Sequence, residues 1–350
     1  MAKKSFVGLD IGSYYTKVIE LEDNKGAILL KNAFKERTPE GIFKHEEIDS
    51  DLMYEFIREI FNVHKIKNKT VAIALNSSFV ITKTVTLPLV VDDEVEQAVM
   101  WEAEQYAPFG MEQVNASYQI MKKDTESNEM TVLIALTKKD IVDSFVKAMK
   151  KAKLKLVLID VDVFALFNAF AKNNYDLKSE HNLLIDAGYN STKLVFTKDE
   201  IPTFSRYVDF SFKSILDSAA ETFEKSPEEI ANIVENFHSS ENETKSAIAA
   251  FINDKIVRLY MQIANSISFY HTNVLESEER IQNIVISGAF CAVFDLIKEN
   301  LPEDILQYNV IAFNPFSALS LEKGSFDLNE ITSNSGSLYS ISLGLAVRSL

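Results

Sequence analysis

Residues Gly8–Leu21 read GLDIGSYYTKVIEL, and residues Leu183–Phe196 read LLIDAGYNSTKLVF. In both stretches an aspartate is followed two residues later by a glycine, and then by a Thr-Lys pair with two apolar residues. Glycine lets the backbone adopt a positive φ or approach a ligand closely, and consecutive N–H groups in such a turn can hold an anion. A single copy is typical of an ordinary tight hairpin. Two matching copies predict a duplicated fold whose two turns face each other and hold a polyphosphate from both sides.

The aspartates of these turns are candidate metal ligands. Asp10 and Asp186 stand at the ends of predicted strands, beside the backbone that would hold the anion. Mg²⁺ prefers oxygen ligands and keeps much of its hydration shell, so both aspartates are predicted to hold Mg²⁺ through water. Lys17 lies one residue into the next predicted strand and would reach a phosphate.

The predicted elements repeat in the two halves. Apolar patterns in the first half predict strands at 5–11, 16–22 and 27–34, a helix at 51–64, and strands at 71–75 and 79–87. The second half begins again at residue 182, with strands at 183–188, 191–197 and 202–209, helices at 212–224, 227–237 and 243–272, a strand at 280–288 and helices at 291–301 and 337–350. This repetition indicates an internal duplication at the scale of a domain.

The sequence changes character after Pro88. An acidic helix is predicted to begin near Asp92 and Asp93 as caps and to end before Pro108. Two strands at 115–121 and 130–136 and a helix at 138–152 follow it. A strand at 155–160 and an apolar helix at 161–174 then complete the first half. Residues 79–152 are therefore predicted to be an insertion.

Composition excludes several classes of protein. The chain has 350 residues, 47% of them hydrophobic, and a net charge of −15. Such an acidic chain is not expected to bind nucleic acid, which needs a basic face, or an anionic membrane directly. A lone cysteine, Cys291, excludes a disulfide within the chain, favours a reducing compartment and is predicted to be a buried apolar residue. Without a signal-peptide pattern or an apolar run of about 18 residues, the protein is predicted to be cytoplasmic and to reach a membrane only through a partner.

Common catalytic motifs are absent from the sequence. There is no G-x-x-x-x-G-K-[ST] or G-x-G-x-x-G nucleotide motif and no G-x-S-x-G nucleophile elbow. The five histidines are not paired at the spacing of metal ligands, so a zinc or di-metal site is not expected.

Four segments, FVGLDIGSYYTKVIELE, VMWEAEQYAPFGMEQV, LLIDAGYNSTKLVF and SLYSISLGLAVR, carry a resemblance to known proteins. Their order resembles the actin-like ATPase superfamily, and more closely the PilM family of type IV pilus assembly proteins. The segment from Trp101 to Phe109 is the most specific of the four. The resemblance covers essentially the whole chain. It implies an α/β, duplicated actin-like (ribonuclease H-like) fold with an inserted 1C subdomain of the FtsA type.

The resemblance also implies a division into four subdomains. Subdomain 1A would comprise residues 1–78, 153–180 and 335–350, and subdomain 1C residues 79–152. Subdomain 2A would comprise residues 181–211 and 273–334, and subdomain 2B residues 212–272.

By resemblance, such a protein binds ATP and Mg²⁺ between its halves and hydrolyses ATP slowly or not at all. It binds the N-terminal cytoplasmic peptide of the inner-membrane protein PilN in a groove between 1A and 1C. As a scaffold, in a ring or another homo-oligomer, it would link pilus motor ATPases to the other inner-membrane pilus components.

The implied nucleotide site has three parts. The first phosphate turn comprises Asp10, Gly12, Ser13 and Lys17, the second comprises Asp186, Gly188, Ser191 and Thr192, and the adenosine loop comprises Ser287, Gly288, Ala289 and Phe290. The loop departs from the Gly-Gly pattern of the family, so Phe290 would either stack on adenine or fill the pocket.

Catalytic and partner-binding residues are also predicted. Asp160 or Asp162 would orient water or a metal, with the alternative that Asp162 only caps the next helix. Trp101, Tyr106 and Phe109 are predicted to bind the partner peptide. Trp101 lies off the apolar stripe of its helix, so it would either anchor that peptide or seal the insertion against subdomain 1A.

Other members of the superfamily remain alternatives. A small-molecule kinase would need a catalytic carboxylate over a closed substrate pocket, which the sequence does not identify. An FtsA-like filament former would carry a terminal amphipathic helix, and a type II secretion L protein would continue into a transmembrane segment. Neither is expected from a chain that ends just after GLAVRSL.

Overall fold

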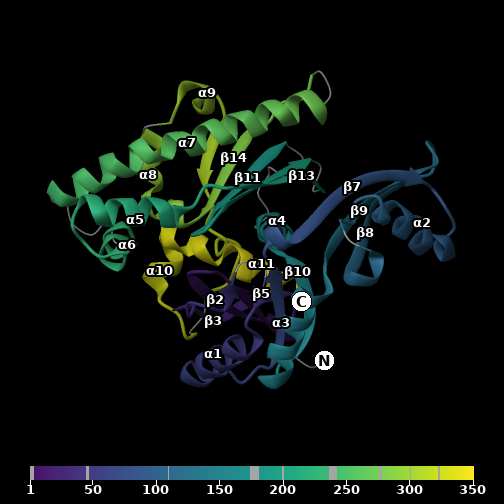
Figure 1. Ribbon diagram of the computed structural model, residues 1–350, viewed down its shortest axis with the longest axis horizontal. Coiled ribbons are helices and arrows are strands. Elements are labelled where there is room, and N and C mark those ends of the chain that lie inside the picture. Colours follow the sequence, from purple (N-terminus) through teal and green to yellow (C-terminus); the bar gives the residue numbers. More distant parts are fainter. Residues whose placement is uncertain are drawn as a thin grey trace.

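The computed structural model describes residues 4–44, 47–108, 110–173, 181–198, 201–235, 243–275, 278–299, 301–321 and 324–350. Two five-stranded sheets form its centre (Figure 1). The first has the order β10-β6-β1-β2-β3, with β1 at Ser5–Ile11, β2 at Tyr15–Asn24, β3 at Ala27–Arg37, β6 at Thr70–Leu75 and β10 at Lys155–Val161. The second has the order β13-β12-β11-β14-β15, with β11 at Asn182–Ala187, β12 at Thr192–Lys198, β13 at Ile201–Val208, β14 at Asn283–Gly288 and β15 at Asn309–Ala312.

The two sheets share one topology. In each, three consecutive strands pair antiparallel, and two later strands continue the sheet parallel to the first of them. The register also repeats, because Asp10 pairs with Lys17 across the first hairpin and Asp186 pairs with Lys193 across the second. Side chains directly opposite each other in an antiparallel pair are close enough to interact. The predicted duplication is confirmed.

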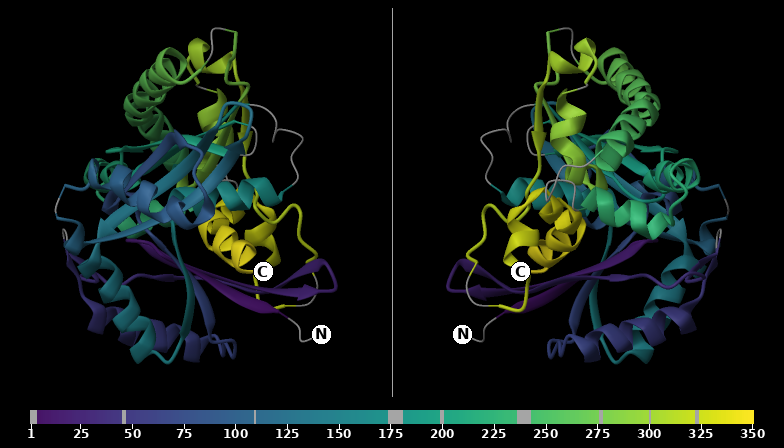
Figure 2. Two further views of the ribbon diagram at one scale, coloured as in Figure 1. Left: turned by 90° about the vertical axis from the view of Figure 1, so that its right-hand side faces the viewer. Right: turned by 90° about the vertical axis from the view of Figure 1, so that its left-hand side faces the viewer.

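Helices cover both faces of each sheet. Helix α1 (Ser50–Val63) and α3 (Lys139–Lys151) pack their apolar residues on the outer face of the first sheet. Helix α4 (Asp162–Lys172) and the C-terminal α11 (Ser340–Ser349) lie between the two sheets and share a core with both (Figure 2). Helices α5 (Phe212–Thr222), α6 (Pro227–Glu235) and the long α7 (Glu243–Asn273) cover the outer face of the second sheet.

The remaining elements are short. They are β4 (Phe43–Lys44), β5 (Glu47–Ile48), α8 (Phe294–Glu299), α9 (Glu303–Leu306), α10 (Leu328–Thr332) and 3-10 turns at Ser77–Phe79, Met111–Gln113, Ala289–Val293 and Asn334–Tyr339. Two predicted helices are therefore shorter than expected, because a 3-10 turn replaces the first part of the helix at 291–301 and of the closing helix at 337–350.

A separate three-stranded sheet projects from the first half (right in Figure 1). Its order is β7-β9-β8, with β7 at Val80–Pro88, β8 at Val114–Asp124 and β9 at Glu129–Lys138. Helix α2 (Asp92–Glu104) packs on it through an apolar core of its own. We call residues 80–138 the three-stranded module.

The ends of this module differ in detail from the predictions. The cap of α2 is Val91, which makes no side-chain cap bond, and Asp92 and Asp93 instead lie in the first turn, where the helix dipole favours acidic residues. Helix α3, which the predicted subdomain 1C includes, buries Ile141 and Phe145 in the core of the first sheet beside α1. The division into four subdomains stays a prediction.

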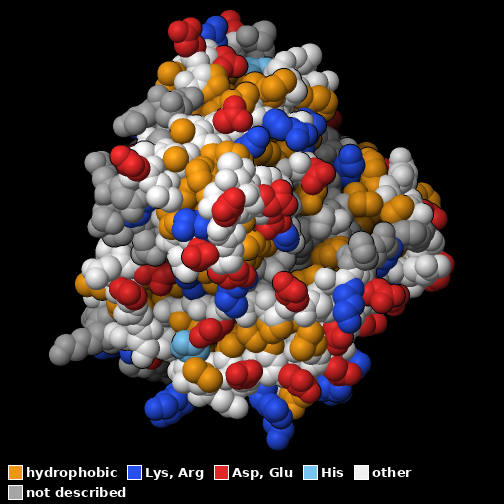
Figure 3. Space-filling model, turned by 60° about the vertical axis from the view of Figure 1, so that its left-hand side comes forward, with side chains coloured by type: hydrophobic (Ala, Val, Ile, Leu, Met, Phe, Trp, Pro, Cys, Tyr) orange, Lys and Arg blue, Asp and Glu red, His pale blue; other side chains and the backbone are white. Residues whose placement is uncertain are grey.

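The surface carries both signs of charge. On the face shown in Figure 3, acidic and basic side chains lie interspersed. Within the described ranges, no helix has both the length and the apolar character needed to cross a bilayer.

Candidate functional site

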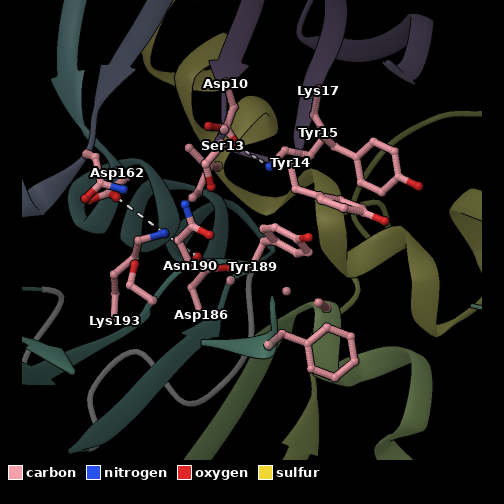
Figure 4. A pocket seen from close by; sticks show the side chains of 18 of the residues that line it. Asp10, Ser13, Tyr14, Tyr15, Lys17, Asp162, Asp186, Tyr189, Asn190 and Lys193 are labelled. Atoms are coloured by element: carbon pink, nitrogen blue, oxygen red, sulfur yellow. Dashed lines mark hydrogen bonds and ion pairs between the residues drawn. The ribbon is translucent and has the colours of Figure 1, made fainter. Parts of the chain in front are cut away.

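A cavity of about 370 Å³ opens where the two Asp-x-Gly turns approach each other (Figure 4). Ligand pockets commonly have volumes of about 300–1,000 Å³. Both halves of the chain line the cavity, so a ligand in it would touch both. Its polar lining includes Asp10, Ser13, Lys17, Asn76, Ser78, Asp162, Asp186, Asn190, Ser191 and Lys193.

Three carboxylates and two ammonium groups form the polar end. Lys17 Nζ lies 2.7 Å from Asp10 Oδ2, and Lys193 Nζ lies 3.0 Å from Asp186 Oδ2. Lys193 Nζ also lies 3.4 Å from Oδ2 of Asp162, which comes from the start of α4. The cross-strand register therefore gives each turn its own ion pair, and Lys193 joins the second pair to a third acid.

Burial and charge shift the pKa values of two of these groups. Burial by itself disfavours the charged ammonium of Lys193, but the carboxylates of Asp186 and Asp162 outweigh it and raise the Lys193 pKa. Burial raises the pKa of Asp162 although Lys193 opposes this, and the nearby Asp186 and Asp10 raise it further. Lys193 is thus a fixed positive charge in the cavity.

The glycines of both turns leave no room for a side chain. A Cβ on Gly12 would lie 2.7 Å from the carbonyl oxygen of Tyr15, and a Cβ on Gly188 would lie 2.9 Å from that of Ser191. Gly288, at the end of β14, has φ +86°, and a Cβ there would lie 2.8 Å from Asp186 Oδ1. These three tight positions surround the cavity, which is what close approach of backbone to a phosphate chain requires.

An aromatic stack joins the two halves at the cavity. The rings of Tyr14 and Tyr189 are stacked with their centroids 3.7 Å apart, and Cζ of Arg37 lies 3.3 Å from the centroid of the Tyr14 ring. Nη2 of Arg37 lies 3.8 Å from Oε1 of Glu228 on α6. Burial, together with Tyr14, raises the pKa of Tyr189 to about 12, so its hydroxyl group stays protonated at neutral pH.

The other end of the cavity is apolar. Gly288 and Ala289 line it, together with Phe212, Leu216, Ala231 and Val234 from α5 and α6. Phe290 instead lies in the core of the second half, 2% exposed, with its ring edge-on to Phe212 at 5.0 Å between centroids. Of the two predicted roles for Phe290, stacking on a base is therefore excluded by its position, and the ring fills the core.

Three other predicted residues are held by protein contacts. The hydroxyl group of Thr192 donates to the carbonyl oxygen of Phe210 at 3.1 Å, and Ser287 Oγ donates to Ser340 Oγ at 2.7 Å. Asp160 Oδ2 lies 2.7 Å from Arg348 Nη1 on α11. All three are buried, and these contacts are structural.

Asp162 is not a helix cap. The cap of α4 is Val161, which makes no side-chain cap bond, whereas Asp162 is the first residue of the helix. Its Oδ1 accepts from the N–H of Val163 at 2.8 Å and from that of Ser77 at 3.0 Å. The expectation that Asp162 only caps a helix is wrong, because its carboxylate lies at the cavity and holds a distant segment.

A family model described as type IV pilus assembly protein PilM matches residues 8–350. The chain belongs to this family. The structure is also similar to a chain of a solved PilM-PilN type IV pilus biogenesis complex, with a TM-score of 0.83, 23% identity and 98% of each chain covered, which confirms the predicted actin-like fold. It is more distantly similar to the ethanolamine utilization protein EutJ from Carboxydothermus hydrogenoformans, with a TM-score of 0.55, 12% identity, and 98% of this chain and 89% of that chain covered.

The three aromatic residues predicted to bind the partner peptide differ in exposure. Trp101 is 72% exposed on α2, so it does not seal the module against the first sheet. Tyr106 packs on the core of the module, and its hydroxyl group donates to Glu102 Oε1 at 2.7 Å. Phe109 lies outside the described residues.

Several lining residues were not predicted from the sequence. The repeated Thr-Lys pair was a signal for Lys193, which occupies the position of Lys17 in the second turn. The tyrosines of the two turns were visible, but their stacking depends on how the halves meet. Asn76 and Ser78 gave no signal, since they follow an ordinary buried strand.

Cys291 offers a simple test of the fold near the cavity. It is fully buried, its thiol donates to the carbonyl oxygen of Ile286 at 3.0 Å, and burial raises its pKa to about 12. We expect negligible reaction of the native protein with iodoacetamide at pH 8, and one thiol labelled after denaturation in urea, measured by mass spectrometry. Fast labelling of the folded protein would contradict this placement.

Proposed function

We propose that this protein is a cytoplasmic ATP-binding scaffold of type IV pilus assembly that binds the N-terminal cytoplasmic peptide of PilN. Membership of the PilM family supports the place in pilus assembly. The choice of PilN as the partner rests on one observation. The structure is similar to a chain of a solved PilM-PilN complex over 98% of both chains. The protein would then be attached to the inner membrane only through its partners. We also propose contacts with pilus motor ATPases and assembly into a ring.

The cavity supports ATP with Mg²⁺ as the cofactor. Its polar end, with Lys17, Lys193 and two glycine turns, suits a triphosphate, and its apolar end beside Ala289 suits a base. Three carboxylates face two ammonium groups there, which leaves one formal negative charge for a cation to compensate. Asp10 and Asp186 are the residues that would hold Mg²⁺ through water. Bound Mg²⁺ would neutralise phosphate charge.

The two candidate catalytic aspartates differ in position. Of the two candidate aspartates, Asp160 is paired with Arg348, and only Asp162 lines the cavity. Asp162 could orient a water, but it is already held by Ser77 and Lys193. Slow hydrolysis, or none, is therefore expected. Because Asp162 is already held, the activity of a small-molecule kinase is also disfavoured. A coupled assay against sugars and acetate would detect such an activity.

Peptide titration tests the proposed partner. We expect a synthetic peptide from the N-terminus of PilN to bind the full chain in calorimetry, with and without MgATP. Trp101→Ala is expected to weaken binding by about 2 kcal/mol, roughly 30-fold, as loss of an exposed aromatic anchor typically does. Val63→Ala is the matched control, because Val63 is also exposed, at 64%, but lies on α1.

The possible failures have different meanings. No binding by the wild-type chain would end the assignment of PilN as partner. Binding that Trp101→Ala leaves unchanged would remove Trp101 from the interface and keep the partner.

A further inference from the structure

Two connections join the three-stranded module to the first half. The first runs from β6 through the 3-10 turn Ser77–Phe79 into β7, and the second leads from β9 directly into α3. The first connection is also part of the cavity wall, to which Asn76, Ser78 and Phe79 contribute. Any ligand in the cavity would therefore lie against the segment that leads into the module.

Asp162 holds this connection from inside the protein. Its Oδ1 accepts a hydrogen bond from the backbone N–H of Ser77 at 3.0 Å, although 85 residues separate the two in the chain. Its Oδ2 faces Lys193 Nζ of the second turn at 3.4 Å across the cavity (Figure 4). The Asp162 side chain is only 4% exposed, so water does not screen these contacts. One carboxylate thus contacts both the base of the module and the opposite half.

Further contacts lead from the module to both halves. Arg348 Nη2 donates to Gln119 Oε1 on β8 at 3.4 Å, while its Nη1 pairs with Asp160, two residues before Asp162. On the other side, Thr82 on β7 lies within hydrogen-bond distance of Ser205 on β13, at 3.2 Å between hydroxyl oxygens. The module therefore has contacts that a shift of one half relative to the other would change.

We propose that Asp162 is a positioning residue that couples the ligand state of the cavity to the placement of the three-stranded module. Phosphate oxygens of a triphosphate would compete with Asp162 for the Lys193 ammonium group. When Lys193 turns toward the ligand, Asp162 loses that partner and keeps the hydrogen bonds from Ser77 and Val163, so a shift of Asp162 moves the Ser77 connection with it. The inference deepens the proposed function, because it uses MgATP as the ligand.

The hydrogen bond from Ser77 can be removed with the lining side chains kept, because Ser77 itself does not line the cavity. Ser77→Pro deletes the N–H, and proline suits the first position of a helical turn. The residue before it, Asn76, has φ −65° and ψ 133°, which is the conformation that proline favours in its predecessor. Ser77→Ala is the matched control, since it removes the hydroxyl group and keeps the N–H.

Spin labels report the placement of the module. Labels are attached at Glu96→Cys on α2 and Asp254→Cys on α7, both exposed positions, and the native Cys291 is buried and stays unlabelled. Distances between the labels are measured by pulsed electron paramagnetic resonance, with and without MgATP, in the otherwise wild-type chain and in both Ser77 variants. MgATP affinity is measured in parallel by calorimetry.

The expected result is a distance shift on MgATP binding in the wild-type chain and in Ser77→Ala, with loss of the shift in Ser77→Pro at unchanged MgATP affinity. Without nucleotide, Ser77→Pro should show a broader distance distribution than Ser77→Ala. An equal shift in all three chains, or no shift in the wild-type chain despite MgATP binding, would overturn the inference. If the wild-type chain bound no MgATP, the proposed cofactor would be wrong. In that case, equal distance distributions for the two Ser77 variants without nucleotide would still overturn the coupling.

Discussion

Gly12→Val and Gly188→Val are each expected to weaken MgATP binding by about 3 kcal/mol, which is roughly a 100-fold loss of affinity. A valine Cβ would meet the carbonyl oxygen of Tyr15 or Ser191 at under 3 Å, so the turn has to open. Opening moves the N–H groups of the turn away from a phosphate, and about two charge-assisted hydrogen bonds are lost. Calorimetric titration with MgATP measures the change.

Gly26→Val controls for the cost of replacing a glycine. Gly26 has φ +93° in the β2–β3 hairpin, with open space around an added Cβ, so valine there strains the backbone far from the cavity. That variant is expected to lose stability and to keep its MgATP affinity. Unchanged affinity in both turn variants would show that the turns do not hold the phosphates.

The repeated turns made the fold predictable from the sequence. Each Asp-x-Gly turn opens a hairpin with the same register, and that register alone places Asp10 opposite Lys17 and Asp186 opposite Lys193. The strands around them were found because their apolar patterns are strong and local. Features set by local pattern are therefore predictable from the sequence, and at the polar end of the cavity they include Asp10, Lys17 and Asp186.

The rest of the site depends on contacts between distant segments. Tyr14 is four residues after Asp10, whereas Tyr189 is three residues after Asp186, so the stacked rings do not occupy equivalent positions of the repeat. Phe290 lies two residues after Gly288, which has a positive φ, and the backbone turn there directs its ring into the core. Neither outcome is visible in local sequence.

The largest effect on stability is expected from Lys193→Met. Lys193 is buried, and its ammonium group lies between the carboxylates of Asp186 and Asp162. Removing one partner of a buried charge cluster leaves uncompensated charge and typically costs about 3–5 kcal/mol. We expect the free energy of unfolding in urea to fall by about that amount at pH 7.

Two comparisons separate lost charge from lost packing. Lys17→Met removes the equivalent lysine of the first turn, which pairs with one aspartate and not two, so it should cost less. Adding Asp162→Asn and Asp186→Asn to Lys193→Met removes the uncompensated charges and should restore part of the stability. A triple variant no more stable than Lys193→Met would show that packing, and not charge, accounts for the loss.

The pH dependence of the free energy of unfolding tests the role of Lys193 independently. In Lys193→Met, protonation of a buried carboxylate removes uncompensated charge, so the folded state binds protons more readily than the unfolded state does, and stability rises as the pH falls from 7 to 5. In the wild-type chain Lys193 opposes the rise of the Asp162 pKa, so the gain in stability at low pH is smaller. The difference in stability between the two chains should therefore shrink at low pH. A difference that stayed constant from pH 7 to 5 would contradict the proposed role of Lys193 as the counter-charge of the second turn.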